Sequence, residues 1–118
     1  MSNPDQRLDI ENIGSVTVAR FLDHKILDES NIEFVGQELF ALVDSDERTQ
    51  IVLDFDLVEY LSSAALGKLI TMHKKVATAG GKLLLCNIQK DILEVFQLTR
   101  LDKVLKLCTT LDDALDKF

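Results

Sequence analysis

The chain has 118 residues, of which 47% are hydrophobic and 28% charged, a composition that excludes intrinsic disorder and fits one folded domain. Its 20 acidic and 13 basic side chains give a formal net charge of −7, which disfavours sequence-independent binding to nucleic acid. The two cysteines lie far apart in the sequence and exclude a disulfide scaffold. We expect a single domain over residues 1–118, with a polar leader at residues 1–7.

The leader carries no apolar segment behind a basic start, which disfavours a secretory signal. Apolar runs such as Leu83–Cys86 are far too short to cross a bilayer. We therefore expect a cytoplasmic protein that contacts neither membrane nor nucleic acid directly.

The first half of the chain predicts two strands and a helix. Residues 10–21 alternate loosely around a central turn, which is typical of two short antiparallel strands. A polar connection follows over residues 22–30. Apolar residues then recur at helical spacing over residues 32–42, and Ser30 or Asn31 is the expected N-cap.

Two strands and a second helix are predicted next. The apolar run Ile51–Phe55 is typical of a strand with both faces covered. A helix is expected after a loop that ends near Ser62–Ser63, running to Ala79, where Gly80–Gly81 stops it. The following strand, Lys82–Ile88, is the most apolar, so we expect it at the centre of the sheet.

A helix at residues 90–99, a strand at residues 104–107 and a helix from Thr110 complete the chain. The element order is therefore β-β-α-β-α-β-α-β-α. Successive strand–helix–strand units imply a mixed, mostly parallel sheet with helices packed against it, and the opening hairpin supplies an antiparallel edge. The fold class predicted is α/β.

Few side chains in the sequence could act as catalytic groups or metal ligands. His73 falls on the apolar stripe of the second helix, where a core or half-buried position is expected, and His24 falls in a polar connection exposed to solvent. Cys86 and Cys108 are expected to be buried, reduced thiols. No spacing of these residues is typical of a metal site. The sequence thus predicts no catalytic residue, no metal site and no cofactor.

One segment stands out, because two serines and several small residues follow each other where the second helix should begin. The simplest interpretation is helix capping, in which one serine side chain accepts a backbone N–H of the first turn. Capping accounts for one serine only. The remaining small side chains leave a low surface for another protein, and a phosphate there would add negative charge to an acidic domain. The segment runs from Val58 to Gly67.

Together with the element order, Ile51–Phe55, Val58–Gly67 and Gly80–Cys86 resemble the STAS domain, and more narrowly the bacterial anti-sigma factor antagonists. The resemblance covers roughly Leu8 to Leu115. It implies an anti-anti-sigma factor that binds an anti-sigma factor, itself a serine kinase, and is reset by a serine phosphatase.

Aligning Ala65-Leu66-Gly67 with the family's Gly-Leu-Gly places Ser63 at the phosphorylated position. By the same alignment, Ser62 stands at the usual aspartate and Ala64 at the second hydroxyl residue. The resemblance also suggests that Leu27–Asp28 matches an element whose acid lies near the partner. It thus implies a docking surface that consists of Ser62, Ala64, Ala65 and Gly67, with Asp28 and Glu29 at its rim.

The leading hypothesis is a monomeric, non-enzymatic binding protein that releases a sigma factor while Ser63 is unphosphorylated. The alternative is a STAS subunit or scaffold of a lipid- or anion-transport complex, or of a stress-signalling complex, that is never phosphorylated.

Overall fold

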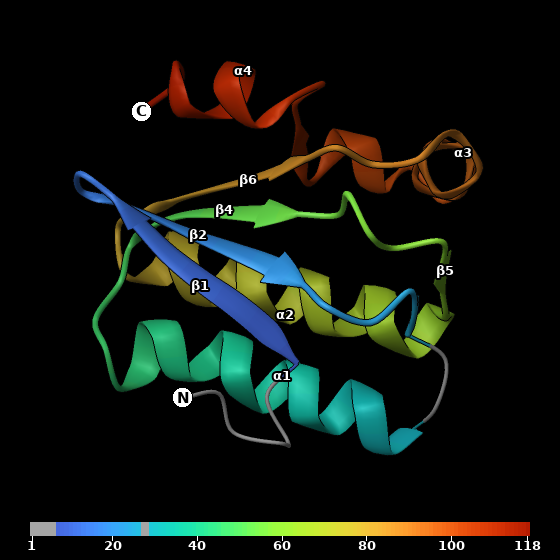
Figure 1. Cartoon of the computed structure of the whole chain (residues 1–118), viewed down its shortest axis with the longest axis horizontal. Helices are drawn as coiled ribbons and strands as arrows, with labels where there is room; N and C mark the ends of the chain where they lie inside the picture. Colours follow the sequence, from blue (N-terminus) through green and yellow to red (C-terminus); the bar gives the residue numbers. More distant parts are fainter. Residues whose placement is uncertain (1–6, 27–28) are drawn as a thin grey trace.

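A five-stranded mixed sheet lies between two layers of helices (Figure 1). The computed structural model describes residues 7–26 and 29–118. The strands follow the order β1-β2-β4-β6-β7, in which only the β1–β2 pair is antiparallel. Their bounds are β1 Leu8–Ile13, β2 Val16–Phe21, β4 Gln50–Asp54, β6 Lys82–Cys86 and β7 Lys106–Leu107.

A second, two-stranded sheet stands apart from the first. It pairs β3 (Lys25–Ile26) with β5 (Tyr60–Leu61) in parallel. Both strands contain only two residues, too few for any sequence periodicity, and neither was predicted. The polar connection expected over residues 22–30 therefore contains a strand.

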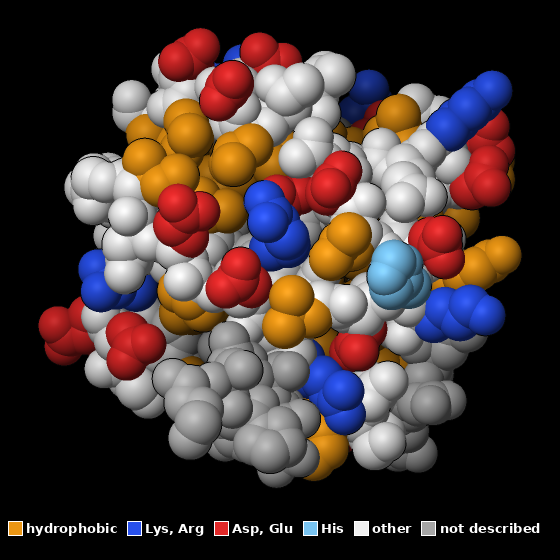
Figure 2. All heavy atoms as spheres, in the orientation of Figure 1, with side chains coloured by type: hydrophobic (Ala, Val, Ile, Leu, Met, Phe, Trp, Pro, Cys, Tyr) orange, Lys and Arg blue, Asp and Glu red, His pale blue; other side chains and the backbone are white. Residues whose placement is uncertain are grey.

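Helices α1 and α2 lie side by side under the sheet, whereas α4 covers the opposite face (Figure 1). The helices are α1 Glu29–Asp44, α2 Ser63–Thr78, α3 Lys90–Leu98 and α4 Leu111–Leu115, and a short 3₁₀ turn spans Leu101–Lys103. Helix α4 has only five residues. Figure 2 shows hydrophobic side chains gathered beside it.

Alternating side chains of the strands build two cores. On β4, Ile51 and Leu53 face the large core under α1, α2 and α3, whereas Val52 faces the smaller core under α4. All three side chains are fully buried, which explains why the strand is apolar at successive positions rather than at every second one. The strand Ile51–Phe55 was therefore predicted correctly as covered on both faces.

The predicted fold class, an α/β domain with a mostly parallel sheet, is confirmed. Besides the missed strands β3 and β5, the predicted N-cap of α1 and the predicted position of β6 were wrong. Helix α1 begins at Glu29, so Ser30 and Asn31 lie inside its first turn and do not cap it. Strand β6 is interior but stands next to the edge strand β7, and the middle position belongs to β4. Apolar content indicates burial on both faces, which β4 and β6 share, and does not tell which of them lies in the middle of the sheet.

Substitution of Gly81, which follows α2, tests the close packing at this point, and Gly67 within α2 serves for comparison. A methyl group on Gly81 would lie 2.1 Å from the backbone oxygen of Thr49, whereas one on Gly67 would meet nothing within 4 Å. We expect Gly81→Ala to lower the free energy of unfolding by about 3 kcal/mol through overpacking. Gly67→Ala, in the interior of a helix, should raise it by about 1 kcal/mol. Urea unfolding of the two variants and the wild type measures both, and equal stability of the two variants would contradict the close approach at Gly81.

Candidate functional site

The two serines of the candidate site take different roles at the start of α2. Ser62 is the N-cap: its Oγ accepts a hydrogen bond from the Ala65 N–H at 3.2 Å, and its backbone oxygen accepts one from Leu66. Ser63 is the first helical residue and is exposed. Among the described residues, no hydrogen bond holds the Ser63 hydroxyl. Capping and exposure are thus divided between neighbouring serines.

The small residues that follow point in different directions. Ala64 and Gly67 are exposed beside Ser63, and the space over Gly67 is open. Ala65 is only 5% exposed and packs in the large core with Leu69 and other residues. The structure therefore brings Ser63, Ala64 and Gly67 to one surface, and the Ala65 side chain faces away from it.

The expected rim of the site is only partly described. Asp28 lies outside the described residues, and Glu29 is the first residue of α1. The N–H of Ser62 donates to the backbone oxygen of Ile26 at 3.1 Å. This bond ties the start of α2 to the end of β3.

The chain that leads to Ser63 is held along its length by residues 24–26. The N–H groups of Glu59 and Tyr60 both donate to the backbone oxygen of His24, at 2.7 and 3.1 Å. The His24 side chain is exposed and lies 3.9 Å from the Glu59 carboxylate, so this pair is weak. The backbone bonds, rather than the side chains, fix this strand pair.

A groove of about 350 Å³ opens between β5 and the start of α3. Elements β5 and α3 and the start of α2 lie at one end of the molecule (Figure 1). Its walls combine apolar and acidic groups, and Tyr60 is 54% exposed at its edge. A surface of this composition suits an apolar or basic segment of a protein partner. The lining residues are Glu59, Tyr60, Leu61, Gln89, Asp91, Ile92 and Val95.

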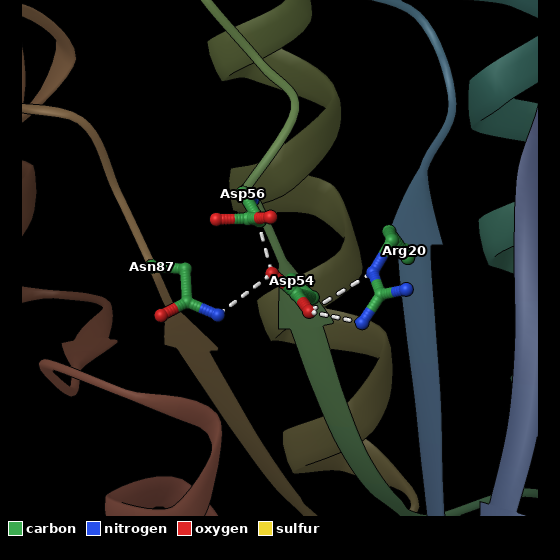
Figure 3. A network of polar contacts seen from close by, with 4 residues as sticks. All are labelled: Arg20, Asp54, Asp56 and Asn87. Carbon is green, nitrogen blue, oxygen red and sulfur yellow. Dashed lines mark hydrogen bonds and ion pairs between the residues drawn. The ribbon is translucent and has the colours of Figure 1, made fainter.

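A polar network at the ends of the strands was not predicted from the sequence (Figure 3). Its centre is Asp54, which is fully buried at the end of β4. One carboxylate oxygen accepts a hydrogen bond from the Arg20 Nε–H at 3.2 Å and forms an ion pair with Arg20 Nη2, also at 3.2 Å. The other oxygen accepts the Asn87 amide and the Asp56 N–H, each at 3.0 Å. The hydrogen bond from Arg20 to Asp54, with the charge of that carboxylate, raises the pKa of Arg20. The sequence feature that could have indicated this network is an acidic residue, Asp54, at the end of an apolar strand.

The histidines and cysteines lie where the sequence suggested, with one exception. His73 is half-buried on α2, His24 is exposed and Cys86 is buried, but Cys108 is only half-buried. Burial, and then the negative charge of Asp54, raise the pKa of Cys86 to about 12. In the described part of the chain, no three His, Cys, Asp or Glu side chains gather as metal ligands, and no helix is long and apolar enough to span a membrane.

Known proteins share this arrangement of strands and helices. The model of the STAS domain family matches residues 8–114. The Bordetella bronchiseptica protein named "Putative anti-sigma factor antagonist BtrV" is 34% identical over 74 residues, which cover 63% of this chain and 63% of the relative. The match therefore spans less than two thirds of that relative's length.

Solved structures agree on the fold. An anti-sigma factor antagonist from Mycobacterium paratuberculosis superposes with a TM-score of 0.82 and 28% identity, covering 99% of this chain and 97% of that one. The phosphorylated form of SpoIIAA, a cell fate determinant of Bacillus, gives a TM-score of 0.70 at 19% identity, covering 93% of this chain and 97% of the other. At that identity the second likeness concerns the fold alone.

The chain belongs to the STAS domain family. Within that family, its similarity is to proteins named as anti-sigma factor antagonists, and the resemblance drawn from the sequence is confirmed.

The division of roles between the serines predicts unequal effects on stability. Ser62→Ala removes the acceptor for the Ala65 N–H and should lower the free energy of unfolding by about 1 kcal/mol. Ser63→Ala removes an exposed hydroxyl and should change it by less than about 0.5 kcal/mol. Denaturant unfolding decides, and a larger loss for Ser63→Ala would show that Ser63 is the structural serine.

The raised pKa of Cys86 predicts an unreactive thiol. At pH 8 this side chain is protonated and buried in the folded protein, so a disulfide reagent such as DTNB should modify it only as the protein unfolds. Cys86→Ala assigns the signal. Modification of Cys86 in the folded state, at the rate of a free thiol, would contradict the burial described.

Proposed function

We propose that this protein is an anti-sigma factor antagonist whose binding is switched at Ser63. Unphosphorylated, it binds an anti-sigma factor and thereby releases a sigma factor for transcription. The anti-sigma factor, a serine kinase, phosphorylates Ser63 and ends the binding, and a serine phosphatase restores it. In this function the protein is a ligand and a kinase substrate, with no catalytic activity of its own.

The observation that carries the proposal is the exposed hydroxyl of Ser63 in a STAS domain, which no other described residue hydrogen-bonds. A kinase needs an accessible hydroxyl, and the neighbouring cap is supplied by Ser62, so modification of Ser63 leaves the cap in place. The names of the relatives support the same function. SpoIIAA, which shares this fold, has been solved in a phosphorylated form, and this supports the modification proposed here.

Electrostatics explain how a phosphate could end binding without unfolding the domain. The first residue of a helix lies at the positive end of the helix dipole, which stabilises a phosphate group. The first turn of α2 carries no acidic residue that would oppose it. Toward the partner, however, the group adds about −1.5 to −2 charge beside the acidic groove that contains Glu59 and Asp91. The fold is kept and the docking surface changes.

The proposed docking surface contains Ser62, Ala64 and Gly67 around Ser63, with Asp28 and Glu29 at its rim. Ala65 contributes from beneath, since its methyl group in the core lets α2 lie close to its neighbours. The groove beside Tyr60 extends the surface toward α3.

Two substitutions at one position test the switch. Ser63→Asp places a negative charge at the helix start and should weaken binding to the cognate anti-sigma kinase by at least about tenfold. Ser63→Ala should bind as the wild type does and should not be phosphorylated. Isothermal titration calorimetry measures the affinities, and mass spectrometry after incubation with kinase and ATP measures the modification.

Ser62→Asp is the matched control, because it adds the same charge one residue away at a position where aspartate also caps a helix. It should remain a phosphorylation substrate at Ser63. Equal affinity of Ser63→Asp, Ser63→Ala and the wild type would refute the switch and favour a STAS subunit that binds without phosphorylation.

A further inference from the structure

We propose that Asp54 is a positioning residue for the Ser63 site, because its buried carboxylate fixes the three chain segments that surround this serine. The inference rests on the proposed function of Ser63 and adds a residue that acts on it through other groups.

The position of Asp54 in the sheet makes this possible. It ends β4, and its neighbours on either side are β2, which contributes Arg20, and β6, which is followed by Asn87. All three strands are parallel, so their carboxyl ends meet at one edge (Figure 1). One carboxylate in the middle strand therefore reaches a donor from each neighbour.

Each of these strand ends leads into a segment beside Ser63. The chain after Arg20 continues to residues 24–26, which accept the N–H groups of the segment before α2. The chain after Asn87 continues into α3, which forms one wall of the groove. The chain after Asp54 itself continues through β5 to Ser63.

Further hydrogen bonds hold the residues that follow Asp54 in place. Its second oxygen accepts the Asp56 N–H, and the Asp56 backbone oxygen accepts the Gln89 side chain at 3.4 Å. Phe55 and Val58 are fully buried, and the Val58 N–H donates to the Phe55 oxygen at 3.0 Å. The path from Asp54 to Val58 is thus a tight turn anchored at both ends, and the bonds to His24 begin at the next residue.

Because Asp54 is charged and buried, the network favours one geometry of its donors over shifted ones. An apolar residue at position 54 would tolerate small shifts of its neighbours, whereas a buried carboxylate loses stabilisation when any of its donors moves away. Asn87 has a left-handed backbone with φ of 57°, a conformation that a non-glycine residue adopts at some cost. That cost is offset by the bond from its amide to Asp54.

The variants separate positioning from general stability. Asp54→Asn keeps the shape but replaces an acceptor by an amide donor that faces Arg20 or Asn87. Asn87→Gly removes one donor and suits the left-handed backbone, so it keeps the fold even where Asp54→Asn does not. Asp44→Asn is the matched control, since it breaks an exposed ion pair with Lys75 near the other end of α2.

Amide hydrogen exchange measures directly how firmly the segment before Ser63 is held, and the experiment needs no partner protein. Asp54→Asn and Asn87→Gly should accelerate exchange at Glu59, Tyr60 and Ser62 by about tenfold more than at Val52, an interior sheet residue that reports global opening. Asp44→Asn should change neither set. Acceleration that is uniform across these amides, or absent, would overturn the proposal.

Phosphorylation kinetics measure whether misplacement of this segment slows the modification of Ser63. With the cognate anti-sigma kinase, Asp54→Asn should lower kcat/KM for Ser63 by on the order of tenfold or more, since small misplacements of a reacting group are costly. The control should match the wild type, and both proteins must be folded under the assay conditions. Equal kcat/KM for Asp54→Asn and the wild type would contradict the proposal. A wild-type Ser63 that the kinase leaves unmodified contradicts the proposed function instead, and the exchange result then decides on Asp54.

Discussion

The buried carboxylate of Asp54 is the constraint to which the rest of the functional end of the molecule is adjusted. A charge without water needs every acceptor position filled, and the donors come from three different segments. Arg20 brings the opposite charge while its own side chain is 40% exposed, so the pair has both a buried and a solvated end. Removing the Asp54 charge from water costs free energy that offsets much of the attraction to Arg20, so we expect the pair to contribute little net stability and to act mainly on geometry.

The start of α2 is compatible with both a stable helix and the proposed switch at Ser63. A helix needs a cap, and a modifiable serine needs a free hydroxyl, and a single residue cannot meet both demands. Here Ser62 caps and Ser63 stays free. Ala65, one turn into the helix, holds the element against the core, whereas Ala64 and Gly67 leave the outer surface low. In the proposed docking surface, small exposed residues therefore stand beside neighbours that carry the packing.

Local patterns predicted most of the fold, and non-local contacts explain what was missed. Apolar runs and helical spacing located the main strands and helices, and the serine pair located the cap. Strands β3 and β5 have two residues each and exist because they pair with one another, which no local pattern encodes. The Asp54 network joins residues more than 30 positions apart, so only the acidic end of an apolar strand hinted at it. Ala65 was assigned to the docking surface, although its spacing to Leu69, Met72 and Val76 is that of the buried stripe.

In the proposed function, Ser63 is a regulated phosphorylation site in the cell. The most direct measurement is phosphopeptide mapping of this protein, isolated from its native cells during growth and under stress. We expect one phosphate, on Ser63, whose occupancy differs between the two conditions. A protein that is unmodified in both conditions, or a phosphate that resides on Ser62 instead, would contradict it.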